Sequence, residues 1–231
     1  ESRTMAQFEV VEDQGLKMIK ATIANETVRA EAGALHYMQG DIELQVETPS
    51  GKGFLKSIVS SESVFKPTYT GTGTIFFGPP IFGMYHILEL DGDPWIIDSG
   101  GYVCSDESVE VGSYTNKALS GFFSGEGFFQ TQVEGTGTVV IQAQGPIHEI
   151  ELENDTLTVD GPFAVARQGH LDFSVEKATK GLIKSGLSGE GLVNVIKGTG
   201  KVLLAPVPSV HMNIVNSINS PILSAIASKS D

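Results

Sequence analysis

The stretch Gly135-Thr136-Gly137-Thr138-Val139-Val140 has a similar stretch before it and another after it in the chain of 231 residues. The Gly-Thr-Gly triplets begin at residues 71, 135 and 198, in steps of 64 and 63 residues. Glutamates at 62, 126 and 190 precede the triplets and recur in steps of 64 residues. Two markers that share one period indicate tandem copies of a single unit.

A second, looser half-unit recurs between these markers, and its copies end in strand-like alternation such as Ile42-Glu43-Leu44-Gln45-Val46. The apolar residues repeat with the period of two that is typical of half-buried strands. Asp91-Gly92-Asp93 and Asn154-Asp155 supply turn residues between such strands. The sequence therefore predicts an all-β fold of short antiparallel strands, in a barrel or a sandwich.

The order of the half-units is circularly offset, because the chain begins with the second half-unit. We expect one domain over residues 1–231, made of three tandem β units and a C-terminal tail. The predicted half-units cover approximately residues 16–50, 53–80, 86–118, 121–146, 148–180 and 186–208, and the tail covers 209–231.

The net charge of −13, with Lys and Arg scattered along the chain, argues against two classes of partner. Clustered basic side chains attract nucleic-acid phosphates and anionic lipids, so we expect no nucleic-acid binding and no membrane binding by charge alone. Peripheral membrane association by other means stays open. No targeting segment and no apolar run of the roughly 20 residues that span a bilayer is visible, and Cys104 is the only cysteine. We expect a soluble, cytoplasmic protein without an internal disulfide.

Two apolar segments are candidate interfaces. The loop that contains Ile81, Phe82, Met84 and Tyr85 is longer than its counterparts in the other units, and it either binds a partner or caps the open end of a barrel. The tail from Ser220-Pro221 predicts a short C-terminal helix. That helix either packs on the barrel edge or docks on a partner subunit through three apolar residues, Ile222, Leu223 and Ile226.

The glycine-rich motifs at 125–129 and 135–139, together with Trp95-Ile96-Ile97-Asp98-Ser99-Gly100, resemble the family named after "altered inheritance of mitochondria" number twenty-four. The resemblance extends from about Phe8 to Pro208, and bacterial members form a domain of unknown function. It implies a fold like that of the tryptophan RNA-binding attenuation protein, with three double-stranded β-helix units in a pseudo-threefold arrangement. Mitochondrial relatives are linked to organisation of the inner membrane and its protein complexes. The family defines no catalytic residues, so the resemblance transfers none and implies no cofactor.

One histidine per repeat forms a candidate metal site. His86, His148 and His211 follow their triplet starts by 15, 13 and 13 residues. Around a threefold axis, three imidazoles could bind zinc and leave one coordination position open. The alternative is that these histidines begin strands and point outward.

Glu62, Glu126 and Glu190 form a second candidate ring. Three carboxylates near an axis would repel one another or bind a hard cation. Their Gly and Ser neighbours indicate, as the alternative, an exposed turn in which the carboxylates are solvated.

These observations favour a non-enzymatic binding or scaffold protein that acts through a protein partner or through self-association. A metal-binding protein or metalloenzyme built on the three histidines is the alternative, and an RNA-binding ring is a weaker one. The chain has no His-x-His pair as in cupin sites, no Gly-x-Ser-x-Gly elbow and no phosphate-binding loop. An enzyme is therefore disfavoured.

Overall fold

The computed structural model describes residues 5–46, 66–78, 83–120, 129–143, 145–160, 163–177 and 192–205. It is all-β, as predicted, with antiparallel strands and one short helix, α2 (Lys117–Ser120), among these residues. The strands are β1 (Gln7–Asp13), β2 (Leu16–Ala30), β3 (Leu35–Gln45), β4 (Thr68–Phe77), β5 (Met84–Asp91), β6 (Trp95–Ile97), β7 (Tyr102–Asp106), β8 (Val109–Thr115), β9 (Phe129–Ala143), β10 (His148–Asp160), β11 (Ala164–Gln168), β12 (Asp172–Lys177) and β13 (Leu192–Leu204).

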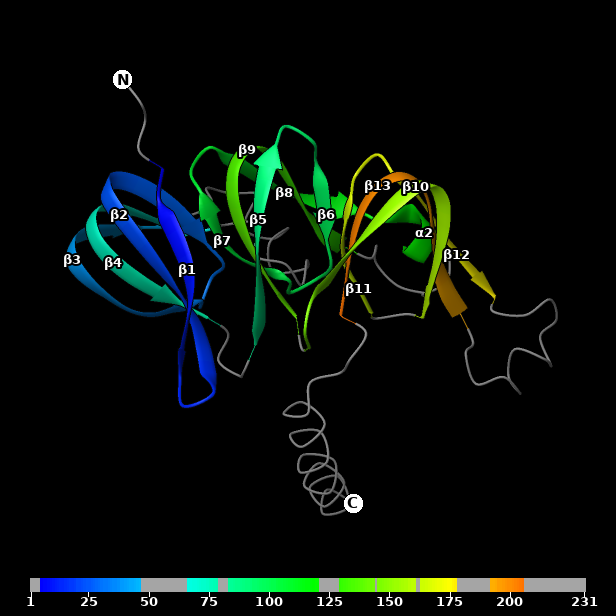
Figure 1. The fold of residues 1–231 in the computed structure, drawn as a ribbon. Coiled ribbons are helices and arrows are strands. Elements are labelled where there is room, and N and C mark those ends of the chain that lie inside the picture. The colour runs from blue at the N-terminus through cyan, green and yellow to red at the C-terminus, as the bar shows by residue number, and fades with distance from the viewer. Residues whose placement is uncertain are drawn as a thin grey trace, which may run out of the picture.

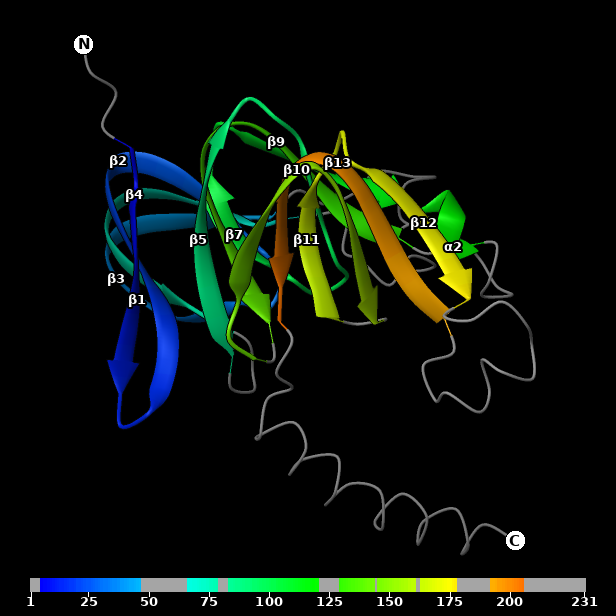
Figure 2. The same ribbon diagram turned by 45° about the vertical axis from the view of Figure 1, so that its right-hand side comes forward.

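The strands join into one sheet of 13 strands with the order β10-β13-β11-β6-β9-β7-β2-β4-β3. β1 pairs with β2, β12 with β13, and both β5 and β8 with β9. We call β1–β4 the first segment, β5–β9 the second and β10–β13 the third. Figures 1 and 2 show the three segments following one another across the molecule, from the blue strands to the orange one.

The Gly-Thr-Gly triplets lie within β4, β9 and β13, and each of these strands pairs with at least two others of its segment. Gly71 and Gly73 have φ angles of 145° and 153°, which side chains of L residues rarely adopt. A Cβ on Gly71 would overlap the carbonyl oxygen of Asp41, and one on Gly73 would overlap that of Gln39. The triplet therefore allows β3 and β4 to approach closely while β4 bends.

The strand opposite the first triplet and the strand opposite the third have an irregularity at the same place. Asn25 in β2 and Asn154 in β10 have φ angles of 60° and 52°, and the register of both strands shifts there. The amide of Asn25 donates to Thr72 Oγ1 and that of Asn154 to Thr199 Oγ1, both at 2.9 Å. The middle threonine of two triplets thus satisfies an amide that the bulge removes from the ladder.

The hydrophobic core continues from one segment into the next. The first cluster contains Ile23 and Phe77 together with Cys104 and Val140 of the second segment. The second cluster likewise extends into the third segment, through residues such as Leu203. Packing across the segment boundaries therefore holds the described residues together.

The predicted C-terminal helix at Ile222, Leu223 and Ile226 lies outside the described residues. In the part of the chain that the structure describes, no helix has the length and apolar character to cross a membrane.

Candidate functional site

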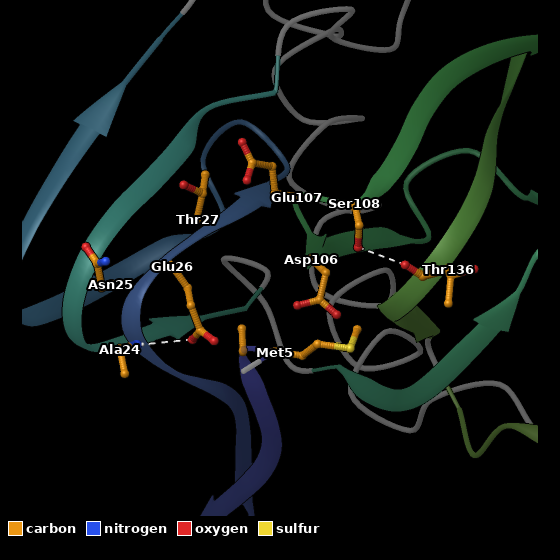
Figure 3. A pocket seen from close by; sticks show the side chains of 10 residues that line it. Met5, Ala24, Asn25, Glu26, Thr27, Asp106, Glu107, Ser108 and Thr136 are labelled. Atoms are coloured by element: carbon orange, nitrogen blue, oxygen red, sulfur yellow. Dashed lines mark hydrogen bonds between the residues drawn. The ribbon is translucent and has the colours of Figure 1, made fainter. Parts of the chain in front are cut away.

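A pocket of about 450 Å³ opens where the first segment meets the second (Figure 3). Its walls come from the bulge of β2, from the β7–β8 turn and from the triplet of β9. The lining residues are Met5, Ala6, Ala24, Asn25, Glu26, Thr27, Asp106, Glu107, Ser108 and Thr136.

Carboxylates dominate the chemistry of this pocket. Glu26 Oε2 accepts a hydrogen bond from the Ala24 amide at 3.1 Å, while its buried Oε1 has no hydrogen-bond partner among the described residues. Asp106 is 4% exposed, and its Oδ2 accepts from the Thr138 amide at 2.7 Å. Burial raises the pKa of Asp106, the hydrogen bonds from Thr138 oppose the rise, and the charges of Glu89 and Glu26 add to it.

The Ser108 hydroxyl is hydrogen-bonded within the wall of the pocket. Ser108 is the only serine in its lining, and the Ser108 hydroxyl donates to the Thr136 carbonyl oxygen at 2.8 Å. No histidine or lysine lines the pocket. The described lining residues therefore form a negatively charged cavity.

At the boundary between the second and third segments, a different side chain lies at the position equivalent to Asp106. Gln168 occupies the place of Asp106, and its Oε1 accepts from the Lys201 amide at 2.7 Å. Gln168 Nε2 donates to Asp93 Oδ2 at 3.2 Å. The side-chain amide of Gln168 thus accepts a hydrogen bond from the backbone N–H of Lys201 and donates one to the carboxylate of Asp93 across the boundary. At the first boundary two carboxylates face each other instead.

The two described histidines of the predicted zinc ring lie at corresponding positions. His86 in β5 pairs with Ile141, and His148 in β10 pairs with Leu204. His86 is half-buried, and burial lowers its pKa while the charge of Glu149 opposes the shift. His148 is exposed. The corresponding residue of β2 is not a histidine but buried Ile19, opposite Phe77.

His211 lies outside the described residues. Among the residues that are described, no group of three or more His, Cys, Asp or Glu side chains is placed to hold a metal ion. The zinc site on His86, His148 and His211 stays a prediction.

The other predicted site residues fall mostly outside the described part of the chain. These are Glu62, Glu126, Glu190, Ile81, Phe82, Ile222, Leu223 and Ile226. Met84 and Tyr85 are described, and they lie in β5 and are half-buried. Tyr85 packs against the core of the first segment, and burial raises its pKa to about 12. The half-buried side chain of Tyr85 therefore contacts the core of its own chain.

Comparison with known proteins supports the resemblance in the motifs. A family model described as mitochondrial biogenesis AIM24 matches residues 8–207. The chain belongs to the AIM24 family. An uncharacterized protein of Streptococcus pyogenes serotype M6 is 27% identical over 189 residues, which cover 77% of this chain and 76% of that protein.

A crystal structure of a protein from Streptococcus pyogenes has the same fold, with a TM-score of 0.72 and 21% identity. The match covers 94% of this chain and 99% of that one. The described strands therefore share the fold of that solved structure.

The exposed apolar surface of this AIM24 protein was not predicted from the sequence. The large hydrophobic side chains that are exposed in the described residues are Met5, Val10, Leu16, Tyr37, Met38, Leu44 and Val46. All seven lie in the first segment or just before it, and the last four lie on β3 or directly after it. β3 is also the last strand of the sheet order. Tyr37 and Met38 stand where β7 and β11 have buried residues, a difference that only the structure shows.

Proposed function

We propose that this AIM24 protein is a non-enzymatic binding or scaffold protein, built from three copies of one β unit, that holds protein partners through the outer edge of β3. The observation that carries the proposal is the exposure of Tyr37 and Met38, at 52% and 39%, on a strand that pairs on one side only within the described residues. Exposed apolar groups next to a free strand edge favour protein contacts, since both side chains and backbone can be satisfied by a partner.

The strand registers support the three-copy arrangement. The sixth residue after each triplet start is Phe77, Ile141 or Leu204. Opposite them lie Leu35 in β3, Tyr102 in β7 and Ala164 in β11, and each of these strands has a register shift within the next two residues. One irregularity at one position in each segment is what copies of a single unit would have.

The composition of β3 also favours a partner. Free strand edges are commonly protected by Lys, Pro or a bulge that turns the edge away. Residues 35–46 contain neither Lys nor Pro, and the one bulge of β3 lies near its start, between Leu35 and Tyr37. The edge is thus chemically suited to accept another strand.

Affinity capture from cells of the source organism tests this function. The bait is the intact chain, compared with a double variant, Tyr37→Glu and Leu44→Glu, and with Val10→Glu as the matched control. Val10 is 41% exposed on β1, which pairs with β2 and not with β3. We expect the double variant to lose proteins that both the unaltered chain and the control retain at equal bait levels. Capture of the same proteins by all three baits would rule out β3 as the binding surface.

A further inference from the structure

The segments are joined by two strand pairings that share one register. At the first joint the end of β2 pairs with β7, and Val28, Arg29 and Ala30 lie opposite Asp106, Ser105 and Cys104. At the second joint β6 pairs with β11, and Trp95, Ile96 and Ile97 lie opposite Gln168, Arg167 and Ala166. Val28 and Trp95 are both paired with the residue two positions before a triplet, Tyr69 and Val133. The two joints are therefore equivalent.

Within the described residues, the position held by β2 and β6 in the joints occurs once more, and so does the position held by β7 and β11. These two additional strands are not paired with each other. Leu157, Thr158 and Val159 of β10 hold the places of Val28, Arg29 and Ala30, because Leu157 pairs with Ile196, two positions before the third triplet. Tyr37, Met38 and Gln39 of β3 hold the places of Cys104, Ser105 and Asp106.

These two strands are the ends of the sheet order, and within the described residues each pairs on one side only. Figure 1 shows β3 in the blue segment and β10 in the yellow-orange one, with the green segment between them. The sheet thus has, at each end of its strand order, one of the two strands that form a joint.

The side chains of β7 and β11 at the two joints are buried, whereas those at the equivalent positions of β3 are exposed. Ser105 and Arg167 are 0% and 5% exposed, whereas Met38 at the same position is 39% exposed. Cys104 and Ala166 are 0% and 4% exposed, whereas Tyr37 is 52% exposed. The covering strand at each internal joint accounts for this difference.

We propose that copies of this chain associate head to tail, with β10 of one copy adding antiparallel to β3 of the next in the register of the internal joints. Leu157 would then pair with Gln39, Thr158 with Met38, and Val159 with Tyr37. The proposal rests on the proposed function, since it names a second copy of the chain as the protein that occupies β3.

The polar residues beside the pairing strands complement each other. Asp93, two positions before Trp95, accepts a hydrogen bond from Gln168 across the second joint. Asp155 stands two positions before Leu157, and Gln39 stands at the place of Gln168. The association would therefore reproduce this carboxylate–amide bond between Asp155 and Gln39, without the facing carboxylates of the first joint.

Such an interface is heterologous, because it uses a different surface on each copy. Every added copy exposes a new free edge, so growth ends only when a ring closes. We therefore expect species larger than dimers at high concentration.

Sedimentation velocity between roughly 1 and 100 µM tests the proposal. Met38→Glu places a charge in the joint from the β3 side, and Thr158→Glu does so from the β10 side. An uncompensated buried charge weakens association by about 100-fold or more. We expect both variants to stay monomeric where the unaltered chain associates, and Val10→Glu to associate normally. Both substituted positions are exposed, so unchanged thermal unfolding at low concentration shows that the variants fold.

An equimolar mixture of the two variants gives the decisive result. The intact β10 of the Met38→Glu chain can pair with the intact β3 of the Thr158→Glu chain, so the mixture should form species of two chains and none larger. A mixture that stays monomeric, or a Val10→Glu chain that also fails to associate, would overturn the head-to-tail joint. An unaltered chain that is monomeric to roughly 100 µM would overturn self-association itself. Loss of captured proteins by the Tyr37→Glu, Leu44→Glu bait would then still support the proposed function.

Discussion

Asp106 and Gln168 show how one backbone requirement is met by two different side chains. Each accepts a hydrogen bond from the amide that follows a triplet, Thr138 or Lys201, because the neighbouring strand is interrupted there. Gln168 does so without charge, whereas Asp106 is buried near Glu26 and Glu89. The carboxylate at the first joint therefore carries an electrostatic cost that the amide at the second joint avoids.

This difference predicts that Asp106→Asn stabilises the protein at neutral pH. The pKa of Asp106 is raised in the folded state above its usual 3.8, so the folded state binds the proton more tightly than the unfolded chain. Stability contributed by this group is present below pH 3.8 and is lost as the pH rises through the folded pKa. Asn keeps the acceptor for Thr138 and has no charge to bury. We expect the free energy of unfolding at pH 7 to increase by an amount on the order of 1 kcal/mol.

Urea unfolding at pH 7 and near pH 3.5 measures this gain, which should shrink at the lower pH. Asp106→Ala is the control, because it removes the acceptor as well and should cost about 1–3 kcal/mol at both values. An Asp106→Asn protein that is less stable than the unaltered one at pH 7 would contradict this explanation of the joint.

At the scale of the strands, the triplets control where the long strands bend. β4 approaches β3 so closely that Gly71 and Gly73 leave no room for a Cβ beside the carbonyl oxygens of Asp41 and Gln39. The bulge at Asn25 lies opposite this triplet, and the bulge at Asn154 lies opposite the triplet at 198–200. Triplet and bulge therefore form one structural device, in which the glycines allow the approach and a threonine hydroxyl satisfies the displaced amide.

The device predicts a large difference between two Gly→Ala substitutions. Gly71→Ala combines a positive φ with overlap onto backbone, and we expect it to lower the free energy of unfolding by about 3 kcal/mol or more. Gly112 in β8 has ordinary backbone and open space around its Cα, so Gly112→Ala should change stability by less than about 1 kcal/mol. Equilibrium denaturation of both variants decides the matter, and similar losses in the two would show that the triplets have no special role.

The sequence predicted these strands well because repetition marks them directly. The Gly-Thr-Gly triplets are identical at their three positions. Glycine-rich motifs of this kind indicated both the all-β class and the AIM24 family. His86 and His148 both lie opposite the sixth residue after a triplet start, although their own offsets from the triplets before them differ by two residues. Counting from the motifs could not show that the first segment has Ile19 at that place, because β2 precedes the first triplet.

At the scale of the whole molecule, the pattern of exposure was beyond sequence reasoning. Alternating apolar residues show that a strand has a covered face, but they do not show which neighbouring strand covers its edge. Tyr37 and Cys104 hold the same place in the strand registers, and their exposures differ because, within the described residues, β7 is paired along both edges and β3 along one. The carboxylates of the pocket were missed for a similar reason, since Glu26 and Asp106 come from different segments.

The proposed assembly requires that β10 of one copy pairs with β3 of the next. Amide hydrogen exchange at two protein concentrations tests this pairing. Amides of Tyr37–Gln39 and Leu157–Val159 should exchange more slowly at the higher concentration, while those of β7 and β11 are protected at both. Amides at β3 and β10 that exchange at the same rate at both concentrations would contradict it, as would slowing at one of the two strands alone.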